Sequence, residues 1–436
     1  MPGETAAINP GLVPSFEAAI QPGRTYTMKI KEAFESVVSQ MGGAGGGSIN
    51  DTRRRFFAKA GAALASLPVL SMESKQAQAQ DFDNSSANHP AGNGPLVIAR
   101  QGSFMAGGSV LQTPGVFDPT VTGGPGQTLH GDHAYAQFQI PQNPRSLPLV
   151  FWPGGGQSGK SFETTPDGRE GYQSIFLRRN FGVYIIDQPR RARAGNTTVG
   201  TTLTPTPGEQ DLFVAWRLGV WPKFFPNSQF PQAKQGINSP ALNQFFRWAT
   251  PDTGPQDRNV ITDGVAALLE EIGPCILIIH SASGVLGWLT AMKSPNVKAI
   301  YAYEPGGGNP DYAFPSNELP PALGSGPTLL SPNPVPLSDF LKLTKIPIRM
   351  QFGDGLSAQS SPYPRVQLWL NRFKMAQQMV AAINKHGGNA SILHLPDIGI
   401  RGNTHFSFSD ANNLQIADIF SQWLAKNRLD GYGGHR

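Results

Sequence analysis

Short apolar runs alternate with amphipathic stretches along most of the chain. Runs of this kind, rich in β-branched and aromatic residues, are typical of strands covered on both faces, as in a parallel sheet. They lie at residues 147–152, 182–187, 275–279, 297–303, 348–353 and 390–395. Helical periodicity is found at residues 259–273, 365–386 and 412–426. This alternation predicts an α/β fold with a mostly parallel sheet and helices on both faces.

Other parts of the pattern are less regular. Strand-like alternation at 95–104 and 134–140 precedes these runs, with a turn expected at 123–126. Residues 196–255 lose clear periodicity but hold many tryptophans and phenylalanines, which predicts a satellite core, a cap over a ligand pocket, or both. Residues 306–347 are rich in proline and are expected to form a loop excursion.

The run at 275–279 passes at once into His280-Ser-Ala-Ser-Gly284, with a helix expected from residue 285. A buried strand that turns sharply into a helix through a serine is typical of a nucleophile elbow. Any strand-to-helix turn also favours serine and glycine, so the motif by itself is weak. We predict Ser281 rather than Ser283 as the nucleophile, from the His-Ser-x-small-Gly register, although Ile279 stands where a small residue is usual.

A glycine-rich loop, residues 153–159, follows the strand at 147–152. Residues 154–161 fit the Gly-x4-Gly-Lys-Ser pattern of a phosphate-binding loop, which would predict a nucleotide-binding protein. Residues 162–168 break the long helix that such a loop needs. The same loop suits an oxyanion hole, because glycine lets a backbone N–H approach a substrate oxygen. We interpret it in that second way.

Two carboxylates end neighbouring strands and compete for the role of a triad acid. Asp354 holds the position that is usual after the seventh strand of a hydrolase, and Glu304 follows the strand before it. Glu304 precedes a Pro-Gly turn that would hold its side chain over the sheet edge. Asp354 could equally cap its own loop. His405 lies in the loop after the last strand, where a general base is expected.

Composition narrows the range of functions. The 436 residues are 39% hydrophobic, enough for a large core, and a formal charge of +5 without long basic tracts does not indicate a nucleic-acid partner. Cys275, the only cysteine, lies in an apolar run and is expected to be a core residue. His130-Gly-Asp-His133 lacks further ligands nearby, so no metal is assigned, and no cofactor is expected.

Residues 1–79 are expected to be an N-terminal extension and an export signal. Arg53 and Arg54 open a twin-arginine pattern, an apolar stretch at 60–70 follows, and a small-x-small cleavage pattern ends at Ala79. The stretch is too short to be a stable membrane anchor. The order of these parts favours export by the twin-arginine machinery, to the periplasm or outside, over a disordered basic tail. We expect translation to start at Met41 and residues 80–94 to be a linker.

Several segments together resemble a small group of exported bacterial esterases in the α/β-hydrolase superfamily, over roughly residues 95–428. These segments are residues 154–168, 185–188, 280–284, 304–306, 352–354 and 402–405. The resemblance implies an α/β-hydrolase domain over 95–430, with Ser281 as nucleophile, His405 as base and Glu304 as acid. It also implies oxyanion donors at the N–H groups of Gly155 and Ala282.

The resulting hypothesis is an exported serine hydrolase that cleaves small carboxylic esters, with apolar or aromatic groups, through an acyl-enzyme. A lactonase or an amidase would use the same residues. A non-catalytic binding protein on this fold, and a nucleotide-binding protein, are the alternatives from other classes.

Overall fold

The computed structural model describes residues 94–433. The expected signal, its cleavage site and nearly all of the linker lie outside the described residues. Within the described part, the central element is an eight-stranded sheet with the order β1-β4-β6-β5-β9-β10-β13-β14. The strands are β1 (Ile98–Ala106), β4 (Ala134–Pro141), β5 (Leu149–Trp152), β6 (Val183–Asp187), β9 (Cys275–His280), β10 (Val297–Tyr303), β13 (Pro347–Phe352) and β14 (Asn389–His394).

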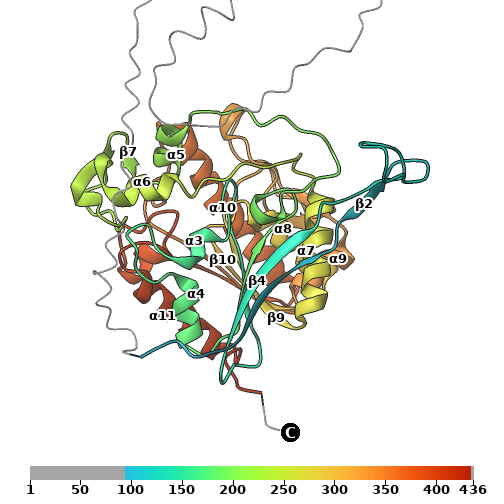
Figure 1. Cartoon of the computed structure of the whole chain (residues 1–436). Helices are drawn as coiled ribbons and strands as arrows, with labels where there is room; N and C mark the ends of the chain where they lie inside the picture. Colours follow the sequence, from blue (N-terminus) through green and yellow to red (C-terminus); the bar gives the residue numbers. More distant parts are fainter. Residues whose placement is uncertain (1–93, 434–436) are drawn as a thin grey trace, which may run out of the picture. The chain divides into compact units, whose positions relative to one another are not determined.

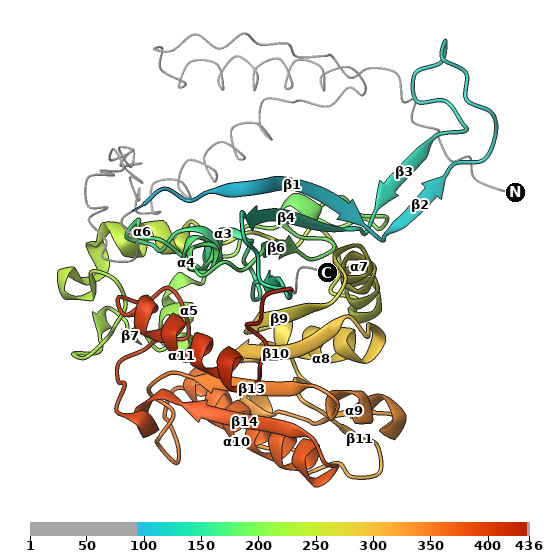
Figure 2. The same cartoon turned by 90° about the horizontal axis from the view of Figure 1, so that it is seen from below.

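Within this sheet, β6, β5, β9, β10, β13 and β14 pair in parallel, whereas β4 pairs antiparallel with both β6 and β1. Figure 2 shows these strands stacked side by side from β1 to β14. The prediction of a mostly parallel α/β sheet is therefore confirmed. The carboxyl ends of the parallel strands share one edge, where an α/β protein usually binds its ligand.

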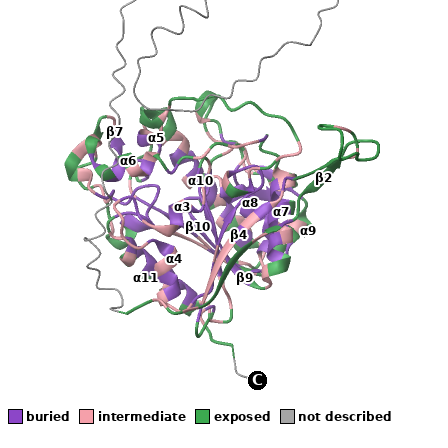
Figure 3. Cartoon of the chain, viewed as in Figure 1, coloured by how far each residue is buried: buried purple, intermediate pink, exposed green. Residues whose placement is uncertain are grey.

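Helices cover both faces of the sheet. One face packs against α7 (Arg258–Ile272), α8 (Ser283–Lys293), α9 (Leu337–Leu343) and α10 (Pro364–Lys385), and the other against α4 (Tyr172–Arg178) and α11 (Asn413–Lys426). In β9, Leu277 and Ile279 belong to the first core, and Ile276 and Ile278 belong to the second. Because side chains alternate along a strand and both faces are covered, this strand is apolar throughout. Figure 3 shows the central strands buried.

Residues 196–255 contain α5 (Glu209–Ala215), β7 (Gly219–Val220), β8 (Lys223–Phe224) and α6 (Pro240–Phe246). Their aromatic side chains pack on the loop that carries His405. The ring centroid of Phe406 lies 5.1 Å from that of Trp216 and 4.8 Å from that of Phe245. The segment thus shares the second core, and it reaches the carboxyl edge of the sheet.

Residues 306–347 are more regular than the proline content predicts. They include β11 (Ala313–Pro315) and β12 (Asn333–Val335), which pair in parallel, and α9. Proline is tolerated in a two-stranded sheet because each strand has an outer edge where no N–H donor is needed. Pro336 comes directly before α9, and the first N–H groups of a helix have no partner within the helix. The expectation of a pure loop excursion is wrong.

An antiparallel hairpin, β2 (Ser109–Gln112) with β3 (Thr128–Gly131), extends from the domain and is largely exposed (Figures 1 and 3). The turn expected at 123–126 lies in its connection. In the described range 94–433, none of the helices combines the length and apolarity needed to cross a bilayer.

Candidate active site

The turn between β9 and α8 holds Ser281 in a strained backbone conformation. Ser281 has φ of 54°, in the left-handed region that residues with a side chain rarely adopt. Its N–H donates to the carbonyl of Tyr303 at 3.1 Å, and its own carbonyl accepts the N–H of Gly306 at 2.8 Å. These bonds tie the serine to both sides of Glu304. Strain that is held by surrounding contacts is typical of functional turns.

The unusual residue before this turn is accommodated from the helix side. Ile279 is fully buried, and a Cβ placed on Gly287 of α8 would lie only 2.8 Å from its Cγ2. Gly287 in the helix therefore leaves space for the Ile279 side chain, so a small residue at position 279 is not needed.

The two serines have different environments. The Ser283 hydroxyl lies 3.0 Å from the carbonyl oxygen of Trp152 and 2.9 Å from that of His280, and it accepts the N–H of His280. This side chain is fully used in holding the turn. The Ser281 hydroxyl has one weak bond, a donation of 3.2 Å to the carbonyl of Gly306, and the residue is 9% exposed. Of the two serines, Ser281 therefore has the hydroxyl that is less engaged in hydrogen bonds.

Glu304 and His405 are brought together at the carboxyl edge of the sheet. His405 Nδ1 lies 2.7 Å from Glu304 Oε2, and both side chains are fully buried. The other carboxylate oxygen accepts the N–H of Gly353 at 2.7 Å. Asp354, the competing carboxylate, instead accepts the N–H groups of Gly355 and Gly402. Gly355 is in the same loop as Asp354, as its alternative interpretation predicted, whereas Gly402 is in the loop that carries His405.

Arg217 completes the surroundings of Glu304 and was not expected from the sequence. It is 3% exposed, and its guanidinium donates to Glu304 Oε2 and, through Nε, to the carbonyl of Asp354 at 2.9 Å. The residue before it, Trp216, accepts the N–H of His405 through its carbonyl at 3.0 Å. Residues 216–217 thus hold both the candidate acid and the candidate base. Nothing in the local sequence marks this arginine among the other basic residues.

The glycine-rich loop lies directly against the turn. A Cβ on Gly154 would lie 2.7 Å from Ser281 Cβ, and one on Gly155 would lie 3.1 Å from Ala282 Cβ. Glycine at 154 is thus required by close packing. The N–H groups of Gly155 and Ala282 have no hydrogen-bond acceptor within residues 94–433. Two unpaired backbone donors next to a candidate nucleophile are the arrangement that an oxyanion hole needs.

The comparisons with known proteins agree with this architecture. No family model matches the chain. It is 29% identical over 316 residues to the probable secreted lipase phiG of a fungal species (strain ATCC 74256), covering 67% of this chain and 85% of that protein. A solved structure of a novel bacterial esterase is 26% identical with a TM-score of 0.60, over 78% of this chain and 99% of that one. The chain has the fold of the α/β-hydrolases.

Burial and charges in this site favour one protonation state at neutral pH. Burial raises the pKa of Glu304, but the Arg217 charge and the hydrogen bonds from His405 and Arg217 outweigh it and lower that pKa to about 2. Burial lowers the pKa of His405; Glu304 opposes this effect, and the Arg217 and Arg372 charges add to it. Burial also holds the pKa of His280 well below its usual value. The carboxylate is thus ionised and both histidines are neutral.

Neutral His405 can act as a base only through Nε2, since Nδ1–H donates to Glu304. Nε2 is buried and has no hydrogen-bond partner among the described residues. The Ser281 hydroxyl donates to the carbonyl of Gly306 in this structure, so the bond between the candidate nucleophile and the candidate base is not formed. A rotation of the Ser281 side chain about χ1 between ordinary staggered positions changes the partner of this hydroxyl.

Other candidate chemistry has a structural explanation in this hydrolase. Asp132, between His130 and His133, forms a buried ion pair with Arg190 at 2.7 Å, and no group of three metal-binding side chains was found within residues 94–433. Lys160 of the loop that resembles a phosphate-binding motif bonds to Thr164 and lies over the Trp248 ring. The helix it opens, α3 (Lys160–Glu163), has only four residues.

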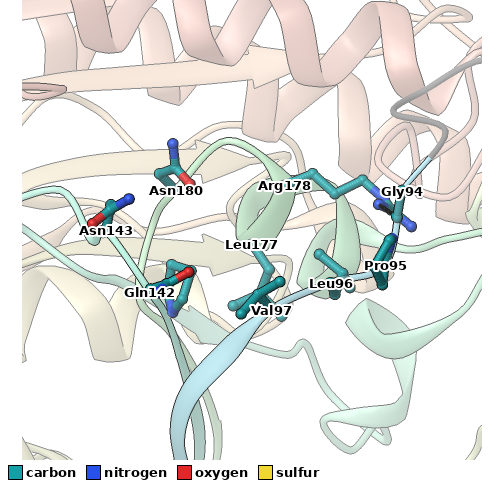
Figure 4. Close-up of a pocket in the computed structure, with 10 residues that line it drawn as sticks. Gly94, Pro95, Leu96, Val97, Gln142, Asn143, Leu177, Arg178 and Asn180 are labelled. Atoms are coloured by element: carbon teal, nitrogen blue, oxygen red, sulfur yellow. Dashed lines mark hydrogen bonds between the residues drawn. The ribbon is translucent and has the colours of Figure 1, made fainter.

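The pocket drawn in Figure 4 is separate from these residues. It lies where the chain enters β1 and where α4 ends, and Leu96, Val97 and Leu177 are among its lining residues. Arg178 at its rim is paired with Glu170 at 2.7 Å. Neither a serine nor a histidine lines it, so it offers no second set of nucleophile and base.

Proposed function

We propose that this protein is an exported serine hydrolase that cleaves carboxylic esters through an acyl-enzyme intermediate. The observation that carries the proposal is the buried hydrogen bond between Glu304 and His405, made at the edge of the sheet where the strained Ser281 lies. The relatives support the ester class, since one is named a lipase and the other an esterase.

In the proposed mechanism, His405 Nε2 removes the proton from the Ser281 hydroxyl as its oxygen attacks the ester carbonyl. The N–H groups of Gly155 and Ala282 bind the oxyanion of the tetrahedral intermediate. Glu304 keeps His405 in the right tautomer and stabilises its cation. His405 then protonates the leaving alcohol, and water attacks the acyl-enzyme in a second step of the same kind.

The surroundings of His405 favour a substrate with apolar or aromatic groups. The His405 ring centroid lies 4.4 Å from that of Trp369, and Trp216 packs edge-on against Phe406. We propose that residues 196–255 act as the cap of a hydrolase domain spanning 95–430, because Trp216 and Arg217 contact the acid and the base.

Labelling with a fluorophosphonate tests the proposal. The mature chain should be modified at Ser281, as mapped by mass spectrometry, and Ser281→Ala should abolish both labelling and ester hydrolysis. A panel of esters, lactones and amides of varied chain length then defines the substrate class. A protein that is folded but is neither labelled nor active on any of these compounds would be a binding protein, and the proposal would be wrong.

We also propose that residues 1–79 direct export and are removed. The relative named as a secreted lipase supports secretion, and the twin-arginine pattern supports this route. In a bacterial host, we expect cleavage after Ala79 and loss of export when Arg53 and Arg54 are both replaced by lysine. N-terminal sequencing of the protein from each cell fraction measures both. An uncleaved, active protein confined to the cytoplasm would contradict this proposal.

A further inference from the structure

The glycine-rich loop is held from behind by a buried arginine, Arg191, which follows β6. Arg191 is 4% exposed, and its Nη1 donates to the carbonyl oxygen of Gly154 at 2.9 Å. Its Nε donates to Asp252 Oδ1 at 2.6 Å, and the two residues also form an antiparallel backbone bridge. The guanidinium is therefore fixed at one end and bound to the loop at the other.

The peptide that Arg191 binds is the one that supplies a candidate oxyanion donor. The carbonyl of Gly154 and the N–H of Gly155 belong to the same planar peptide group. In a trans peptide these two bonds point in opposite directions. A donor that fixes the carbonyl on one side therefore fixes the direction of the N–H on the other side.

This peptide needs such a restraint because the glycines on either side of it restrict its orientation very little. Gly154, Gly155 and Gly156 have no side chains, and glycine populates both signs of φ readily; Gly156 has φ of 64°. Rotation of the 154–155 peptide would change the direction of the Gly155 N–H with little steric cost to its own residues. The bond from Arg191, together with the 2.9 Å bond from Thr250 N–H to the Gly156 carbonyl, opposes that rotation.

A charged donor is also the strongest restraint available at this point. A guanidinium binds a carbonyl oxygen more strongly than a neutral donor does, and burial increases the difference. The same bond polarises the peptide and makes its N–H a better donor. The sequence has three arginines within residues 190–193, and it does not show which of them reaches the loop.

We propose that Arg191 is a positioning residue for ester hydrolysis: by binding the Gly154 carbonyl, it aims the Gly155 N–H at the oxyanion of the transition state. This inference rests on the proposed function of Ser281 and of the Gly155 N–H. It assigns Arg191 no contact with substrate.

Steady-state kinetics and a reversible boronic acid inhibitor test the inference. The boronic acid forms a tetrahedral adduct with a catalytic serine and so reports on the oxyanion site. Since loss of one oxyanion donor costs about 10²–10³ in kcat, a misdirected donor in Arg191→Met should lower kcat by about tenfold to a hundredfold. Affinity for the boronic acid should fall by a similar factor, while KM stays near that of the unchanged protein, because the ground-state ester does not depend on this donor.

Arg190→Met is the matched control. Arg190 is the neighbouring residue, is also 4% exposed, and is paired with Asp132 by two bonds of 2.7 and 3.0 Å. Among the described residues, its side chain hydrogen-bonds only to Asp132 and to the carbonyl of Pro255, and not to the glycine-rich loop. This variant should lower the melting temperature, as loss of a buried ion pair does, with kcat and boronic acid affinity retained. A purely structural role of Arg191 would give the same result for both variants.

If Arg191→Met does not fold, Asp252→Asn replaces it, because Asp252 is partly exposed and orients the guanidinium. A smaller loss of kcat and boronic acid affinity at constant KM is expected. Unchanged kcat and affinity in the variant tested would overturn the inference. Absence of fluorophosphonate labelling at Ser281 in the unchanged protein would instead remove the proposed function, so the two failures are distinguishable.

Discussion

Replacing Glu304 by glutamine tests the assignment of the acid most directly. The carboxylate of Glu304 accepts three donors: His405 Nδ1–H at 2.7 Å, the N–H of Gly353 at 2.7 Å, and the guanidinium of Arg217. Glutamine keeps the size but has one oxygen and one NH2 group. In either orientation of the amide, its NH2 group faces at least one of these donors.

Two effects of different size follow from this conflict. The amide cannot stabilise the His405 cation and favours the wrong tautomer, and a comparable change in a serine protease lowers kcat by about 10⁴. At 1.36 kcal/mol per factor of ten, this corresponds to about 5.5 kcal/mol of transition-state stabilisation. Arg217 also loses its buried counter-charge, and breaking a buried ion pair costs about 3–5 kcal/mol of folding free energy.

The assay is ester hydrolysis at saturating substrate, run at a temperature at which circular dichroism shows the variant to be folded. Asp354→Asn is the control, because Asp354 also follows a neighbouring strand. Within residues 94–433, its carboxylate accepts only the N–H groups of Gly355 and Gly402 and a weak bond from Asn227. We expect kcat of the control to stay within about tenfold, with a stability loss of about 1–3 kcal/mol. A crippled Asp354→Asn beside a nearly normal Glu304→Gln would refute the assignment.

Three further predictions concern the same edge of the sheet. Ser283→Ala should keep measurable activity and fluorophosphonate labelling. Its free energy of unfolding, measured by chemical unfolding, should fall by about 1–3 kcal/mol, because the buried N–H of His280 loses its acceptor. Labelling that requires Ser283 would contradict this prediction. The acidic limb of the pH profile of kcat/KM should lie below pH 6.5, because burial and the Arg217 charge lower the pKa of His405. Arg217→Met removes that charge and should move the limb to higher pH. A limb that stays in place would argue against the electrostatic role of Arg217. Gly154→Ala should lower kcat by at least about tenfold, because the added Cβ would lie 2.7 Å from Ser281 Cβ and must displace the oxyanion loop; normal kinetics would show that the loop adapts.

The sequence by itself determined the elements of the sheet and the edge at which the chemistry should lie. A strand that is buried on both faces is apolar at successive positions, and this pattern is visible in its own sequence. The runs at 275–279 and 297–303 therefore predict β9 and β10 without knowledge of their neighbours. The residue that follows each strand then lies at the carboxyl edge. That is why Ser281 and Glu304 could be singled out before the strand order was known.

Where regular patterning was weak, local reasoning was less successful. Proline content suggested a loop at 306–347, but β11, β12 and α9 form there, because edge strands and helix starts have N–H positions that proline can occupy. The choice between Glu304 and Asp354 was likewise open locally, since both follow apolar strands. Only the folded chain shows which carboxylate His405 contacts.

Tertiary structure alone decided how the charged residues are used. Arg217 lies 87 residues from Glu304 in the chain, and Arg191 lies 37 residues from Gly154. Neither arginine differs in its local sequence from arginines that only stabilise the fold, such as Arg190. A buried charge needs a partner, and that partner is fixed by which loops meet at the sheet edge, a long-range property of packing that no local pattern of residues encodes.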